Sequence, residues 1–249
     1  MRPARRVPRV CTPLCALVFC AAAGPALAQD ISISLGSEGS ISARSIQLIA
    51  LITVLSLAPG LAIMITCFPF MVTVLAILRQ GIGLQQSPPN MLIVSLALFL
   101  TYFVMEPVFT EAWDLGIRPL LDDAVAPDVA FDRAMAPFRE FMSARMDPET
   151  FASMAALRPD TAGMTATSDA PLSVMIPSFL LSEISRAFQI GFLIFLPFLI
   201  IDLVVAAVLM SMGMMMVPPA IVSLPFKLAF FVIADGWRLI ADSLVRSYF

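Results

Sequence analysis

Four charged residues in the apolar C-terminal third of the chain are the first candidates for chemistry. Glu183, Arg186 and Asp202 interrupt apolar runs, where a lone charge costs roughly several kcal/mol. Glu183 and Arg186 lie three residues apart, so they can pair on one helical face or meet charges of a neighbouring subunit. Asp202 has no partner close in sequence. Its carboxylate could act in a proton relay or pair with a charge on a neighbouring subunit, and we expect the pairing with a neighbouring subunit. Lys227, the only lysine, is expected to cap or pair near a helix end.

Other residue types that carry chemistry are scarce. The chain has no histidine, which removes the usual general base and the commonest metal ligand. It has no GxSxG, HExxH or paired-aspartate motif, so an intramembrane hydrolase is disfavoured. We expect no enzymatic activity, no metal and no cofactor.

A methionine-rich stretch is the second candidate site. Five of seven consecutive positions are methionine: Met210, Met212, Met214, Met215 and Met216. Gly213 lies among them, and Pro218 and Pro219 follow, so the chain is expected to leave helical geometry near Val217. Methionine is flexible and often only fills gaps in a core, but from a loop the same side chains could close a pore.

The composition indicates a membrane protein. Hydrophobic residues make up 59% of the chain and charged residues 13%, against roughly 25% charged in soluble domains. Four arginines, a short apolar stretch and the A-x-A sequence ending at Ala28 predict a signal peptide cleaved before Gln29. Cleavage would leave only one cysteine, Cys67, which excludes an internal disulfide. It would also leave 11 basic and 18 acidic residues, and this acidic balance argues against nucleic-acid binding.

The elements that position these residues are expected to be helices. The apolar run at 45–78 predicts one long kinked helix or a hairpin broken near Pro59 or Pro69, and a brief helix at 91–105 should stop at Pro107. Residues 106–171 hold 12 acids and five arginines and form an acidic insert, with one apolar helical face around Phe138 and a loop from Asp147 to residue 171. The C-terminal apolar runs should be cut at Pro177, at Pro197 and at the pair Pro218-Pro219. Broken helices need protein neighbours to satisfy their backbone.

These observations predict an all-α integral membrane protein of broken helices and helical hairpins that assembles into an oligomer. We divide the chain into a signal peptide (1–28), an exposed lead-in (29–44), N-terminal hydrophobic hairpins (45–105), the acidic insert (106–171) and C-terminal hydrophobic helices with the methionine loop (172–249).

The C-terminal motifs resemble the FliP family of flagellar type III export-gate proteins. They are SE at 182–183, AFQIGF at 187–192, PFLIIDLV at 197–204, GMMMVPP at 213–219 and LPFK at 224–227, with PPN at 88–90 and LALFLT at 96–101 upstream. The injectisome homologues, the SctR family, share much of this pattern, but the signal peptide and the acidic insert favour the flagellar branch. Two positions depart from the family: Pro69-Phe70 replaces a usual basic residue, and Ser185 replaces a frequent lysine.

The resemblance implies a bacterial inner-membrane protein of the flagellar basal body, with the insert on the periplasmic side. It implies a ring of several copies with FliQ-like and FliR-like gate proteins, served by FlhA-like and FlhB-like export proteins. Unfolded flagellar subunits would pass through this channel, which the methionine loop would close as a gasket. The alternative is a secondary transporter or ion channel that uses Asp202 at mid-depth. An internal repeat would favour that alternative, and we see none between the two apolar halves.

Overall fold

The computed structural model describes residues 41–83, 88–214 and 216–249, and every regular element in these ranges is helical. The chain divides into two units, Met1–Ile49 and Ala50–Phe249. The predicted signal peptide and its predicted cleavage site at Ala28 and Gln29 lie outside the described residues, as does Met215. Three described helices are long and apolar enough to cross a membrane, or four if one bent pair is counted as a span. The prediction of an all-α membrane protein is therefore confirmed.

The first apolar run forms two helices, α2 (Ile41–Met64) and α3 (Phe68–Ile82). The break falls at residues 65–67, because Pro69 occupies the first turn of α3, where proline fits without losing a hydrogen bond. Pro59 lies inside α2 and does not break it. Helix α3 buries one face, at positions such as Phe70, Val74 and Leu78, whose spacing of four matches the helical period.

The second apolar helix is longer than the sequence predicts. Helix α4 (Asn90–Ala112) passes through Pro107, continues as a π-helical turn, η1 (Trp113–Ile117), and ends in the short α5 (Arg118–Leu121). The predicted stop at Pro107 is wrong, since a proline removes one hydrogen bond of a helix but does not have to end it. The predicted boundary of the insert at residue 106 falls within α4.

The acidic insert contains α6 (Pro127–Arg145) and α7 (Pro148–Ala156). Helix α6 runs through Pro137, and its predicted apolar face is partly buried, with Met142 inaccessible and Phe131 exposed. The prediction of a loop from Asp147 onward is wrong for its first part, because the Asp147 carboxylate accepts a hydrogen bond from the Thr150 backbone and caps α7.

The C-terminal third contains α8 (Leu172–Ser211), α9 (Pro219–Ile233) and α10 (Gly236–Arg246). Helix α8 is continuous over 40 residues, so the predicted cuts at Pro177 and Pro197 are wrong. The chain breaks instead after Ser211 and again at Asp235, where a left-handed residue separates α9 from α10 at an angle of 61°.

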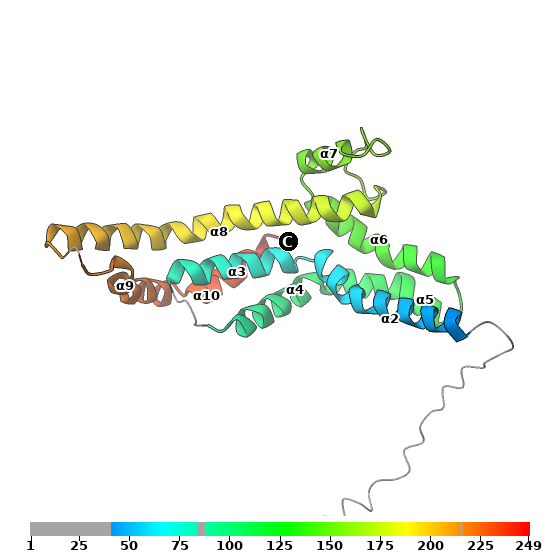
Figure 1. Cartoon of the computed structure of the whole chain (residues 1–249), viewed down its shortest axis with the longest axis horizontal. Helices are drawn as coiled ribbons and strands as arrows, with labels where there is room; N and C mark the ends of the chain where they lie inside the picture. Colours follow the sequence, from blue (N-terminus) through cyan, green and yellow to red (C-terminus); the bar gives the residue numbers. More distant parts are fainter. Residues whose placement is uncertain (1–40, 84–87, 215) are drawn as a thin grey trace, which may run out of the picture. The chain divides into compact units, whose positions relative to one another are not determined.

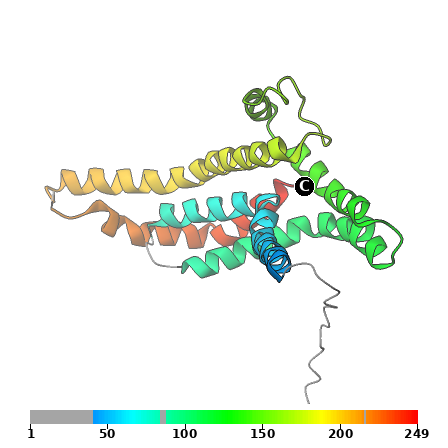
Figure 2. The same ribbon diagram turned by 45° about the vertical axis from the view of Figure 1, so that its right-hand side comes forward.

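Helix α3 lies along α8 in both views of the structure, and α4 packs on α3 (Figures 1 and 2). The main hydrophobic core lies between these helices and includes Leu100 of α4, Ala187 of α8 and Leu244 of α10. A second core joins α6, α7 and the first turns of α8, with Phe151 and Phe179 fully buried. The second core holds the first turns of α8 and the main core holds its middle, at Ala187 and Phe198, so α8 connects the insert to the methionine-rich stretch.

Candidate functional site

The methionine-rich stretch spans the last turn of α8 and the connection to α9, and we call residues 210–217, of which 215 is outside the described residues, the methionine turn. Gly213 has φ +74°, a left-handed conformation that costs glycine little, and its N–H donates to the carbonyl of Met210. Pro218 is the N-cap of α9, and Pro219 lies in its first turn. The predicted departure from helical geometry is correct, but it begins at Met212 rather than near Val217.

The described methionines of this turn do not pack into the core of their own chain. The exposed fractions of Met210, Met212, Met214 and Met216 are 61%, 66%, 42% and 97%. Exposed apolar side chains concentrated on one turn require a covering partner, a membrane or one another. This exposure rules out core filling within the chain for these four residues.

Asp202 and Lys227 form an ion pair close to the turn. Lys227 Nζ lies 2.6 Å from Asp202 Oδ2 and 3.2 Å from the carbonyl oxygen of Gly81, and Ser223 Oγ donates to Asp202 Oδ1 at 2.5 Å. The ion pair joins α8 to α9, and the Gly81 contact adds the end of α3. The expectation that Asp202 needs a neighbouring subunit is wrong, because Lys227 of the same chain balances its charge. This pairing also weakens the case for a proton relay at Asp202.

Glu183 lies at the centre of a second charged cluster and has no exposed surface. Arg145 Nε is 3.1 Å from Glu183 Oε1, Arg186 Nη1 is 3.7 Å from the same oxygen, and the hydroxyl of Tyr248 donates to Oε2. The expected pairing with Arg186 is present, but Arg145 is the closer and more buried partner. The interpretation of Glu183 as a contact between subunits does not fit this conformation, because its carboxylate is covered by its own chain.

Arg145 connects this cluster to the residues that follow α10. Its Nη1 donates to the carbonyl of Ser247 at 2.7 Å, and its guanidinium lies 4.0 Å from the centre of the Tyr248 ring. Burial, and then the charge of Glu183, raise the pKa of Tyr248 well above its usual value. The aromatic rings of Phe70 and Phe141 complete the enclosure.

Sequence reasoning missed Arg145, Tyr248, Ser223 and Gly81. Arg145 lies 38 positions before Glu183, and Lys227 lies 25 positions after Asp202, so no local spacing brings either pair together. Among the described residues no group of three or more histidine, cysteine, aspartate or glutamate side chains could hold a metal ion.

These features define a class: an all-α integral membrane protein whose charges on the long apolar helix are paired within the chain and whose longest apolar helix ends in an exposed methionine turn. Comparison with known proteins gives the family. The family model of FliP matches residues 51–244, so the chain belongs to the FliP family.

Relatives that carry the name flagellar biosynthetic protein FliP come from several bacteria. The protein of Caulobacter vibrioides is 53% identical over 224 residues, which cover 90% of this chain and 84% of the relative. That of Rhizobium meliloti is 50% identical over 214 residues, which cover 85% of this chain and 86% of the relative. That of Bacillus subtilis is 45% identical over 222 residues, which cover 88% and 98%. The resemblance to the FliP family is thereby confirmed along most of the chain.

Proposed function

We propose that this chain is a core component of the flagellar type III export gate in the bacterial inner membrane. Several copies would form a ring with FliQ-like and FliR-like proteins, next to FlhA-like and FlhB-like export proteins. Unfolded flagellar proteins would cross the membrane through this ring, with the acidic insert on the periplasmic side. Membership in a family of flagellar biosynthetic proteins supports the flagellar part of the proposal, and the long apolar helices support the membrane location.

The exposure of the methionine turn is the observation that carries the channel proposal. Side chains that find no cover in their own chain are available to meet the same side chains of other copies around an axis. Long unbranched thioethers exclude water and ions when they touch, yet they rearrange readily around chains of any sequence. Such a set of methionines would act as a gasket, and no catalytic step is needed for this role.

The ion pair of Asp202 with Lys227 would hold the methionine turn in place. Asp202 precedes the turn by two helical turns, and Lys227 follows it by a similar distance in α9. Because the Lys227 side chain is only 6% exposed, separating the two helices would leave a buried lysine without its partner, although Asp202 is 32% exposed. The pair therefore restrains the two arms of the turn, while Gly213 and the prolines set its path.

The test is a triple variant in which Met214, Met215 and Met216 are replaced by alanine. We expect this gate to assemble but to leak ions or small solutes, because several methylene and sulfur groups are lost from each copy. The measurement is conductance or small-solute entry in cells that carry the gate without export substrate.

A matched control replaces three exposed methionines elsewhere in the chain, Met64, Met91 and Met164, with alanine. This variant removes the same atoms and should stay as tight as the wild type. If the triple variant of the turn assembles normally and leaks no more than this control, the gasket proposal is wrong.

A further inference from the structure

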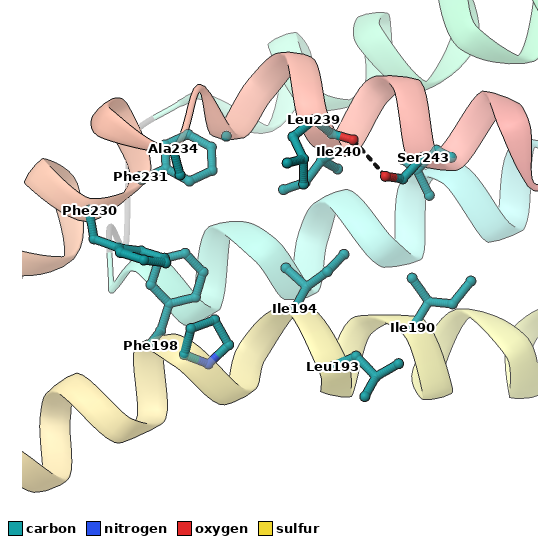
Figure 3. Close-up of a pocket in the computed structure, with 13 residues that line it drawn as sticks. Ile190, Leu193, Ile194, Phe198, Phe230, Phe231, Ala234, Leu239, Ile240 and Ser243 are labelled. Carbon is teal, nitrogen blue, oxygen red and sulfur yellow. Dashed lines mark hydrogen bonds between the residues drawn. The ribbon is translucent and has the colours of Figure 1, made fainter.

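An apolar groove lies beneath α10, between this helix and α8. Figure 3 shows Ile190 and Ile194 of α8 pointing toward Leu239 and Ile240 of α10, with Phe198 and Phe231 closing one end. The cavity measures about 530 Å³. Its one lining residue with a polar side chain is Ser243, whose hydroxyl donates to the carbonyl of Leu239 at 2.7 Å. The groove thus offers an occupant no free hydrogen-bonding side chain.

The lining and size of the groove restrict what can fill it. An extended peptide would bring backbone N–H and C=O groups that no lining side chain satisfies. A narrow apolar chain without polar groups meets this requirement and is small enough for the cavity.

The outer face of α10 carries a balanced set of charges next to the groove. Arg238 pairs with Asp235 at 3.8 Å, and Arg246 pairs with Asp242 at 2.8 Å. These four exposed side chains line a separate hollow of about 310 Å³, which shares Leu239 and Ala234 with the groove. A ligand whose apolar part lies in the groove would therefore meet two guanidinium groups and two carboxylates at its polar end.

We propose that the groove binds one acyl chain of a zwitterionic phospholipid such as phosphatidylethanolamine. The phosphate would accept hydrogen bonds from Arg238 or Arg246, and the ammonium would meet Asp235 or Asp242. A purely anionic headgroup would leave the two carboxylates facing negative charge. The strong separation of apolar and charged faces on α10 is typical of a helix at the membrane surface, where headgroup and acyl chain are both within reach.

The proposal can be tested on the purified full chain in vesicles that contain a trace of phosphatidylethanolamine with a photoactivatable group midway along one acyl chain. We expect labelling of peptides from 190–198 and 239–244 to exceed severalfold that of α2, whose apolar side chains are also exposed. The same label on phosphatidylglycerol should mark these peptides less.

Leu193→Trp should fill the groove and reduce the labelling severalfold. Leu203→Trp is the matched control, because Leu203 lies on the same helix, is similarly exposed and does not line this groove. Ser243→Trp fills the groove from the α10 side and replaces Leu193→Trp if that variant fails to fold. Equal labelling of α2, no effect of either groove variant, equal labelling by phosphatidylglycerol, or cross-linking of the groove to a second copy of the chain would each overturn the proposal.

Discussion

Replacement of Glu183 by alanine tests whether this residue stabilises its own chain. The variant removes the carboxylate that neutralises Arg145 and accepts the hydroxyl hydrogen bond of Tyr248, in a position without exposed surface. Arg145 remains, largely buried, and its Nη2 already has no hydrogen-bond partner in the described structure. The variant therefore leaves a buried charge without compensation.

The size of the effect follows from burial. Breaking a buried ion pair by removing one partner costs about 3–5 kcal/mol, because the remaining charge stays desolvated. The contact with Arg186 adds little, since that guanidinium is partly exposed and screened by water. We expect the free energy of unfolding to fall by about 3 kcal/mol or more.

The assay is denaturant unfolding of the purified chain in mild detergent, repeated over a range of protein concentrations. An effect within the chain does not depend on concentration, whereas an effect on a subunit contact does. Asp114→Ala is the control, because its pair with Arg118 is exposed and should contribute about 0–1 kcal/mol. If Glu183→Ala costs no more than this control, or if its cost disappears on dilution, the assignment of Glu183 to an intrachain cluster is refuted.

Two further predictions follow from the burial of the Tyr248 side chain and from the close contact of Gly116 with α6. Because the pKa of Tyr248 is raised in the folded chain, its contribution to stability is fully present below the unfolded pKa near 10 and is lost as the pH rises above that value. Tyr248→Phe should therefore flatten the fall of the unfolding free energy between pH 9 and 11. An unchanged slope would contradict the burial of the Tyr248 hydroxyl. A Cβ on Gly116 would lie 2.7 Å from the carbonyl oxygen of Ala130, so Gly116→Ala should cost about 1–3 kcal/mol. A Cβ on Gly60 would meet nothing within 4 Å, so the control Gly60→Ala should leave the unfolding free energy unchanged or raise it. Equal losses of unfolding free energy for the two variants would show that η1 does not pack on α6 as described.

The sequence predicted the class of fold because hydrophobicity and helical spacing are local properties. It predicted helix starts better than helix breaks. Pro69 and Pro219 mark real starts, since proline fits the first turn of a helix. Pro107 and Pro197 were expected to end helices but lie inside them. A lone proline removes one hydrogen bond, and the packing of the flanking turns decides whether the helix continues.

The methionine turn was predictable for the same reason, since Gly213 and the two prolines reinforce one another within a few residues. The charge pairs were not. Arg145 reaches Glu183 only because α6 and α8 pack side by side, and Lys227 reaches Asp202 only because α9 folds back beside α8. A pairing that depends on tertiary packing leaves no trace in the spacing of residues along one helix.

The length of α8 limits how this chain can lie in a bilayer. At 1.5 Å per residue its 40 residues extend about 60 Å, roughly twice the thickness of the hydrocarbon layer. Even tilted by about 40°, near the limit for membrane helices, the rod would reach some 15 Å beyond that layer. The first turns of α8, with Val174 and Phe179, pack against α6 and α7, whereas only 11% of the most apolar window of the helix is buried inside the chain. The end of α8 that leaves the hydrocarbon layer is therefore the one that the acidic insert covers with protein.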